Sequence, residues 1–360
     1  MRAFLIDDSG CVELDAWPDQ LPPGGHLWLA CPRREFEVQV AQVQAALHRW
    51  TGGSLVDLHI SDLLNQHLPS HYDYTSWYDL LVFRRLAAAP GSNGPPTPES
   101  TAQAMQALQA IDTHPVGFAV FDRVLLTVHP ADCPVREFFA QRLTQIQPVS
   151  GGTSRLPASP ADLMLRIVNH MVDGYLELRR LLSRQLDTLQ NKLLGPRSRH
   201  RNWQALLESR NSLHQLEDIC EDQRSAMQEW IDALDEWPPA KDSQAARERE
   251  LLRVRSRDVL EHIERVLSHV RRLESSSESA MQMHFSALGQ RTNDIMRTLT
   301  VLTAIFLPLN LITGIFGMNF DFLPLIHSNT GFWIAMALMA SVAVGLGAFF
   351  WRKRYLGTRH

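Results

Sequence analysis

The chain has 360 residues, which is enough length for about two domains. Its formal net charge of −4 gives no support for a nucleic-acid-binding protein. Its charged residues are unevenly spread, since none occurs from Thr298 to Phe320 or from Phe332 to Trp351. A helix needs about 20 mainly apolar residues to cross the hydrocarbon core of a bilayer. The composition therefore predicts two transmembrane helices near the C-terminus, preceded by a long charge-rich segment.

The N-terminus lacks a secretory signal pattern, because its apolar run is short and Asp7 and Asp8 follow at once. We therefore expect the charge-rich part to stay in the cytoplasm. The four cysteines are far apart and form no Cys-x-x-Cys pair, which predicts unpaired thiols in a reducing compartment. They are Cys11, Cys31, Cys133 and Cys220.

The pattern of apolar runs and turn signals predicts a mixed α/β domain over residues 1–158. Short apolar runs between turn signals predict strands at Ala3–Ile6, Val12–Leu14, His26–Ala30, Leu80–Phe83, Phe118–Val120 and Val124–Val128. Helical spacing predicts helices over Phe36–Trp50 and Val135–Leu143. Residues 89–98, rich in Pro and Gly, predict a flexible loop or insertion, and residues 149–154 predict a linker that closes the domain.

Three helices are predicted to follow. Ser159 and Pro160 form an N-cap signature, and apolar residues then recur every three or four positions to Leu193, in one helix ended by Gly195-Pro196. A second helix is predicted from about Asn202 to Asp235. A third, with a near-heptad apolar seam, would run from Asp242 to Phe316 without interruption over ~110 Å. The alternative is two helices with a break near Gly289, but glycine alone is a weak breaker.

The tripeptide Gly317-Met318-Asn319 follows the first apolar span and precedes a short loop and the second span. With the preceding segment 305–316 and the flanking segments 291–296 and 351–356, it closely resembles the CorA family of Mg²⁺ channels, the two-transmembrane Gly-x-Asn family. The resemblance is strong from about Pro160 to Leu356 and loose before it.

This resemblance implies an α+β fold with two transmembrane helices per subunit, assembled as a funnel-shaped homopentamer in the cell membrane, the bacterial inner membrane in particular. The expected domains are 1–158 (α/β), 159–296 (helical domain and stalk), 297–316 (pore-lining span), 317–331 (outer loop), 332–351 (second span) and 352–360 (basic tail). The first span of each subunit would line the pore with Asn293, Met296, Leu299, Thr303, Leu307, Asn310 and Gly314, and the filter would be Gly317, Met318 and Asn319.

Mg²⁺ sheds its hydration water reluctantly, so a ring of neutral amides and carbonyls can hydrogen-bond the hydrated ion without stripping it. Asn319 would supply the amide and contact the ion through water, with Asp321 and His327 at the outer mouth. The positive-inside rule predicts that both termini lie in the cytoplasm, because positive charge flanks the two spans at Arg297, Arg352, Lys353 and Arg354.

Two positions depart from the family pattern: Leu325 stands where an acidic residue is common, and Gln282 stands where some members carry an acidic neck residue. The histidines are scattered and form no metal-binding motif. Glutamates along the stalk are expected to lie on a solvated face with i,i+4 ion pairs. They are Glu248, Glu250, Glu261, Glu264, Glu274 and Glu278.

The leading functional hypothesis is a channel for hydrated divalent cations, Mg²⁺ first, with Co²⁺ and Ni²⁺ as further ions. One alternative is a Zn²⁺ transporter like the ZntB branch, with proton coupling as one version of it. Another is a membrane-anchored sensor or scaffold that conducts nothing. The sequence contains no P-loop, nucleophile elbow or metal-hydrolase motif, so we expect no enzyme and no organic cofactor; the expected partners are further copies of the chain, divalent cations and the lipid bilayer.

Overall fold

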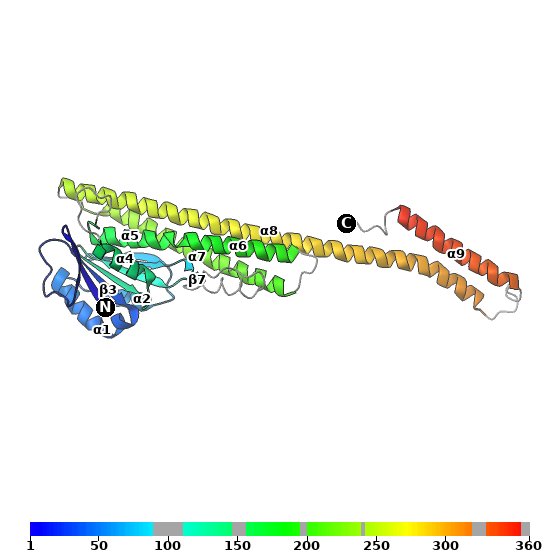
Figure 1. Ribbon diagram of the computed structural model, residues 1–360, viewed down its shortest axis with the longest axis horizontal. Coiled ribbons are helices and arrows are strands. Elements are labelled where there is room, and N and C mark those ends of the chain that lie inside the picture. The colour runs from blue at the N-terminus through cyan, green and yellow to red at the C-terminus, as the bar shows by residue number, and fades with distance from the viewer. Residues whose placement is uncertain (89–110, 146–155, 195–199, 239–241, 319–328, 354–360) are drawn as a thin grey trace. The chain divides into compact units, whose positions relative to one another are not determined.

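A computed structural model of the chain describes residues 1–88, 111–145, 156–194, 200–238, 242–318 and 329–353 (Figure 1). The chain forms two compact units, Met1–Glu278 and Ser279–His360. The loop expected at 89–98 and the linker expected at 149–154 lie outside the described residues. The domain boundary after residue 158 stays a prediction.

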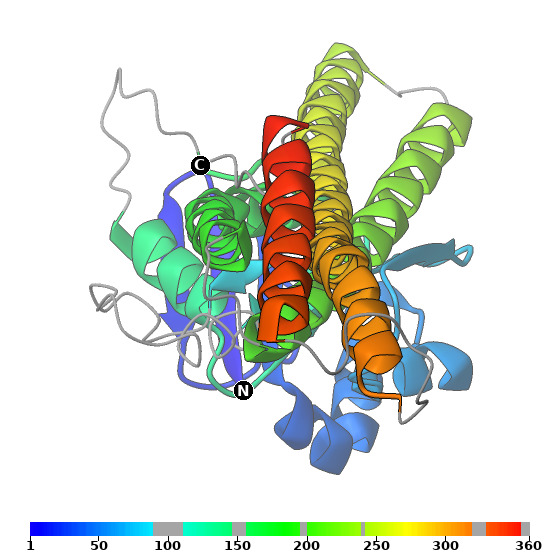
Figure 2. The same cartoon turned by 90° about the vertical axis from the view of Figure 1, so that its right-hand side faces the viewer.

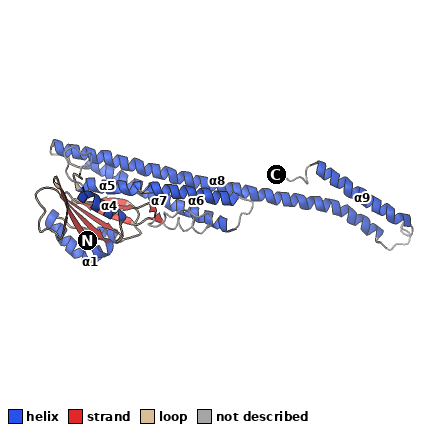
Figure 3. Cartoon of the chain, in the orientation of Figure 1, coloured by secondary structure: helices blue, strands red, loops and turns tan. Residues whose placement is uncertain are grey.

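The first unit is built on a seven-stranded sheet in the order β2-β1-β3-β9-β8-β5-β4 (Figure 3). Its strands are β1 (Arg2–Asp7), β2 (Gly10–Leu14), β3 (His26–Pro32), β4 (His71–Tyr74), β5 (Asp79–Arg84), β8 (Pro115–Val120) and β9 (Val124–His129). Neighbouring strands in this sheet are antiparallel except β3 and β9, which are parallel, with Leu29 opposite Leu126. A separate two-stranded ribbon pairs β6 (Ala87–Ala88) with β7 (Ile111–Asp112). All six predicted strands are confirmed.

Helices cover both faces of the sheet. On one face lie α1 (Arg33–Thr51) and α2 (Asp57–Leu64), and on the other lie α4 (Pro134–Gln145) and α5 (Pro160–Asp173) (Figure 1). Phe36 and Leu47 of α1 are fully buried against Leu29 and Leu126 of the sheet. Burial of each such side chain contributes roughly 1.5–3 kcal/mol to folding, so this apolar layer is a main source of stability for the first unit.

Arg33 is a buried charge that joins three elements at the start of α1. Its Nε donates to the carbonyl oxygen of Leu63 over 3.1 Å, and its Nη2 donates to the carbonyl oxygen of Pro115 over 2.7 Å. Burial lowers the pKa of this guanidinium. The two carbonyls partly replace the water that Arg33 loses, and they connect α1 with the end of α2 and with β8.

The long apolar stripe expected to form a single helix after Pro160 is divided in two. α5 ends at Asp173 and α6 (Tyr175–Leu194) begins after Gly174, whose backbone is still helical (φ −55, ψ −23). A Cβ at Gly174 would lie 3.2 Å from the Met171 carbonyl oxygen and 3.7 Å from Cβ of Ala87. The single-helix prediction was therefore wrong at Gly174, a residue that lies close to the β6 ribbon. The predicted end at Gly195-Pro196 lies outside the described residues.

The two remaining predicted helices in the first unit agree closely with α7 (His200–Glu236) and with the start of α8 (Ser243–Phe316). α8 is one helix of 74 residues and passes through Gly289 without a break, so it contributes residues to both units. In the second unit it is followed by α9 (Asn329–Arg352). α8 and α9 are long and apolar enough to cross a membrane, and only 6% of each apolar window is buried within the chain, unlike the core helix of a soluble protein.

All four cysteines are buried free thiols, as expected. Burial raises the pKa of Cys11 to about 11 and that of Cys220 to about 12. It also raises the pKa of Cys31 and of Cys133. These thiols therefore serve as small apolar packing groups.

Candidate functional site

The residues proposed to line a pore form a continuous strip along the membrane part of α8. An α-helix turns by about 100° per residue, so residues three, four or seven apart share one side. Leu307, in the middle of the strip, is 66% exposed in the single chain. The described members are all exposed: Asn293, Met296, Leu299, Thr303, Leu307, Asn310, Gly314, Gly317 and Met318.

The opposite side of α8 packs against α9, as Figure 2 shows with α9 in red beside the end of α8 in orange. Val301 of α8 is only 1% exposed and Ala335 of α9 only 8%, and Ile305, Pro308 and Ile312 are half-buried on the same side of α8. A cavity of about 270 Å³ lies between the end of α8 and the start of α9, lined by Ile312, Thr313, Phe316, Gly317, Phe332, Ala335, Met336 and Met339. Thus α9 leaves the strip uncovered.

The polar side chains of the strip do not bond to α9 in the described part of the chain. The Thr303 hydroxyl donates to the carbonyl oxygen of Leu299, one turn earlier, over 2.9 Å. Among the described residues the side-chain amide of Asn310 has no hydrogen-bond partner, although Asn310 lies in an apolar span. An amide in hydrocarbon is costly unless it finds a polar partner, so Asn310 suits contact with water or with another subunit.

Gly317 sits where α8 ends. Its N–H donates to the Thr313 carbonyl oxygen over 2.9 Å, and the N–H of Met318 donates to the Ile315 carbonyl oxygen over 3.3 Å. A Cβ at Gly317 would lie 3.0 Å from the Thr313 carbonyl oxygen, which is tighter than ordinary packing. Gly317 is not among the positive-φ glycines of the described chain, which are Gly10, Gly25 and Gly52, so a side chain here would be disfavoured by this close contact and not by the backbone conformation. Asn319, Asp321 and His327 lie outside the described residues.

Two glutamates expected on a solvated face of α8 have partners on α7; Glu274 is half-buried, and Glu278 is exposed, as expected. Glu278 accepts a hydrogen bond from Arg210 over 2.9 Å. The Oε1 atom of Glu274 lies 3.8 Å from Nδ1 of His214. The expected i,i+4 pairing does occur at Glu261, whose carboxylate lies 3.9 Å from Arg265. Periodicity alone could not reveal the other pairs, because α7 and α8 are distant in sequence.

These contacts create a cluster of metal-binding side chains. Potential ligand atoms of His214, Glu217 and Glu274 all lie within 4.8 Å of one another. Arg271 donates to Glu217 over 2.7 Å and lowers the pKa of that carboxyl, whereas the adjacent Glu217 raises the pKa of Glu274. One imidazole and two carboxylates suit a transition-metal ion, but Arg271 competes for Glu217.

The scattered histidines of the α/β part include one with structural hydrogen bonds. His59 is buried, with Nδ1 2.7 Å from the Tyr78 hydroxyl and Nε2 3.0 Å from Asp73. His71 lies 3.8 Å from Asp62. The imidazole of His59 therefore links α2 to β4 and to Tyr78, the residue before β5.

Comparison with known proteins identifies a family. A family model described as "CorA-like Mg2+ transporter protein" matches residues 54–354. The cobalt/magnesium transport protein CorA of Thermotoga maritima is 31% identical over 100 residues, which are 28% of each chain. The namesake protein of Methanocaldococcus jannaschii is 45% identical over 64 residues, 18% of this chain and 20% of the relative. The alignments thus span less than a third of the length of these curated relatives.

The fold comparison extends over the full length. The structure of the CorA magnesium transporter from Methanocaldococcus jannaschii matches with a TM-score of 0.72 at 20% identity, and the match covers 98% of both chains. At that identity the likeness establishes the fold. Since the family model also covers most of the sequence, the chain belongs to the CorA-like Mg²⁺ transporter family.

Proposed function

We propose that this protein carries divalent cations across a membrane, with Mg²⁺ as the principal ion and Co²⁺ and Ni²⁺ as further ones. The observation that carries the proposal is the uncovered strip of α8, which lies opposite the side that packs on α9. A strip of this kind, in a helix apolar enough to span a membrane, is suited to line a shared pore. Family membership and the names of the relatives support the choice of ions.

The pore would be formed by several copies of the chain. The described part of one chain offers two candidate spans, too few to enclose a polar path, so closure requires symmetric copies. The family resemblance favours five. Asn310 and Thr303 would then face the axis, and Met296, Leu299 and Leu307 would form apolar rings that can close the path by dewetting.

Selection would occur at Gly317, Met318 and Asn319, where α8 has ended. A ring of Asn319 amides can hydrogen-bond the water shell of Mg²⁺ without removing it. Asp321 and His327 would lie at the outer mouth, and both termini in the cytoplasm. Inward movement is then driven by the membrane potential, which contributes about 4.6 kcal/mol per 100 mV for two charges.

Ion uptake into liposomes tests the proposal. The purified full chain is reconstituted, and uptake of Mg²⁺, Co²⁺ and Zn²⁺ is recorded with and without a pH gradient, against protein-free liposomes. We expect Mg²⁺ uptake that depends on membrane potential and is indifferent to the pH gradient. Uptake of Zn²⁺ alone, driven by the gradient, would replace this proposal with the ZntB-like alternative. No uptake of any ion by assembled protein would favour the sensor or scaffold.

A further inference from the structure

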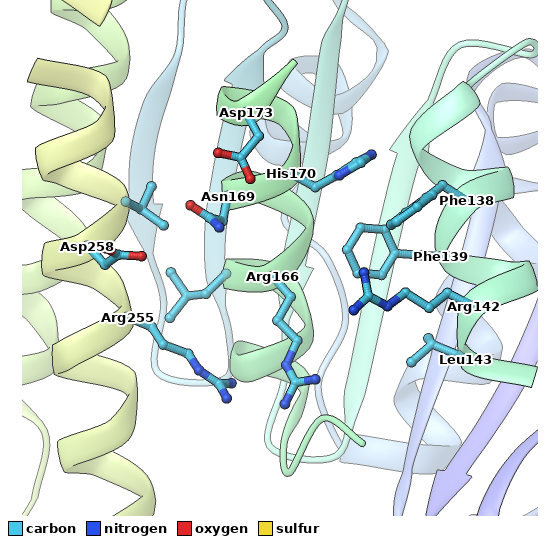
Figure 4. Close-up of a pocket in the computed structure, with 12 residues that line it drawn as sticks. Phe138, Phe139, Arg142, Leu143, Arg166, Asn169, His170, Asp173, Arg255 and Asp258 are labelled. Atoms are coloured by element: carbon cyan, nitrogen blue, oxygen red, sulfur yellow. The ribbon is translucent and has the colours of Figure 1, made fainter. Parts of the chain in front are cut away.

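A second feature of the first unit is a cavity of about 330 Å³ among α4, α5 and α8 (Figure 4). One of its walls is aromatic: the ring of Phe138 stacks on His170 with centroids 4.1 Å apart and planes 5° apart. Arg142, Arg166 and Arg255 line the same cavity from three different helices, as Figure 4 shows. The volume is comparable with that of a small-molecule site.

Positive charge exceeds negative charge at this end of the cavity. Arg166 donates to the Asp162 carboxylate over 3.1 Å, and Arg255 forms an ion pair with the same carboxylate. Arg142 has no carboxylate partner among the described residues, and its guanidinium lies 5.6 Å from the centre of the Phe138 ring. Two of the three guanidinium groups, those of Arg166 and Arg255, therefore share the buried carboxylate of Asp162, and Arg142 adds a third positive charge beside them.

Burial makes the charges of two of these arginines costly. Burial, and then the nearby Arg142, lower the pKa of Arg166, and burial lowers the pKa of Arg255. Burial is also the main reason that the pKa of His170 is lowered. At the other end, Asp173 and Asp258 lie 3.5 Å and 3.7 Å from the two ring nitrogens of His262. These two carboxylates thus lie beside His262 and form no ion pair with the three arginines in the described chain.

We propose that this cavity binds a phosphate-bearing anion between α8 and the α4–α5 pair. Guanidinium groups match phosphate oxygens in geometry and form charge-assisted hydrogen bonds with them. The Asn169 side-chain Oδ1 is buried without a hydrogen-bond partner in the described chain, so it can accept from a hydroxyl of the ligand. A phosphate held by Arg142, Arg166 and Arg255 would brace α8, the helix that also carries the proposed pore strip.

Binding of phosphate to the full chain in detergent tests this inference. Calorimetric titrations with inorganic phosphate and with metal-free ATP are compared for the parent, Arg142→Gln, Arg142→Lys and Arg257→Gln. Arg257 is an exposed arginine on α8 that does not line the cavity, so Arg257→Gln makes the same charge change elsewhere. We expect Arg142→Gln to weaken binding about tenfold, since it removes a charge-assisted contact. Arg142→Lys should keep part of the affinity, and Arg257→Gln nearly all of it.

Comparing inorganic phosphate with ATP distinguishes a free phosphate ligand from a nucleotide ligand. Tighter binding of ATP than of inorganic phosphate assigns the cavity to nucleotides, and equal binding assigns it to simple phosphate. Failure of the parent to bind either ligand at millimolar concentration would overturn the proposal. So would equal losses in Arg142→Gln and Arg257→Gln when both variants elute and unfold like the parent, because binding would then be a general charge effect.

Discussion

The indole Nε1 of Trp230 in α7 donates a hydrogen bond to the hydroxyl of Ser256 in α8 over 2.9 Å, and both side chains are fully buried. The Ser256 hydroxyl in turn donates to the Leu252 carbonyl oxygen over 2.8 Å. Both groups thus have partners, and α7 is fixed in register against α8.

We expect Ser256→Ala to lower the free energy of unfolding by about 1–3 kcal/mol, because the indole N–H is left buried without an acceptor. The measurement is chemical unfolding of the full chain, followed by tryptophan fluorescence and circular dichroism. Trp230→Phe and the double variant complete a thermodynamic cycle. If the two single losses simply add in the double variant, the hydrogen bond does not couple the helices.

Acid should destabilise the first unit through His26 and His129. Burial lowers the pKa of each from the ordinary 6.5 to about 4. Between these values the unfolded chain binds a proton at each site that the folded chain does not, so stability rises with pH. The expected slope is about 1.4 kcal/mol per pH unit for each histidine.

His129→Gln should remove its share of that slope between pH 4.5 and pH 6.5 in unfolding experiments. The exposed His48→Gln, on α1, provides the control. An unchanged slope in His129→Gln would mean that His129 is as easily protonated in the folded protein as in the unfolded chain.

Thr303→Val should reduce Mg²⁺ flux several-fold, because it removes a hydroxyl from the proposed pore strip while preserving size. Thr298→Val is a matched control, since the Thr298 hydroxyl likewise donates to a carbonyl one turn earlier, that of Asp294, over 2.9 Å. Thr298 lies roughly on the side of α8 away from the strip by the 100° periodicity. The measurement is Mg²⁺ uptake into liposomes by both variants. Equal fluxes through Thr303→Val and Thr298→Val would show that Thr303 does not line the pore.

Gly317→Ala should impair transport, because the added Cβ would lie 3.0 Å from the Thr313 carbonyl oxygen where α8 ends. Gly289→Ala places the same methyl group in open space on the same helix, and should leave transport intact while favouring the helix by about 1 kcal/mol. Uptake is measured after size-exclusion chromatography has confirmed assembly. Normal flux through Gly317→Ala would show that the end of α8 tolerates the shift.

Asn319→Ala should abolish most Mg²⁺ flux without affecting assembly, since the hydrated ion loses an amide partner at the constriction. Asn319→Asp keeps the shape but adds a ring of negative charge, so ions should bind more tightly and leave more slowly. Parental flux through assembled Asn319→Ala would exclude the Gly-Met-Asn ring as the filter.

Local patterns predicted most of the elements. The N-cap predicted at Ser159 is confirmed, since its hydroxyl accepts from the Asp162 N–H over 3.2 Å. The α2 helix and β4 were missed. β4 consists of His71-Tyr72-Asp73-Tyr74, which lacks the alternation of apolar and polar residues that marks a half-buried strand.

Features that depend on distant residues could not be predicted. Gly174, where the helix is divided, lies near Ala87 of the β6 ribbon, and the cluster of His214, Glu217 and Glu274 joins two helices. Three arginines on three helices likewise give no motif in the sequence. The residues of the proposed pore strip, by contrast, follow from the resemblance to the CorA family, and helical periodicity adds that Thr303 and Asn310 share one side of the helix. The filter residue Asn319 lies outside the described residues.

The burial of all four cysteines has a practical consequence for chemical mapping of α8. Alkylating reagents attack the thiolate, and these inaccessible thiols with raised pKa values should stay unmodified in the folded protein. A single cysteine introduced at successive positions from 293 to 314 would then be the reactive thiol of each variant, in an otherwise native chain. Its rate of modification by a water-soluble reagent would record, residue by residue, which side of the helix meets water.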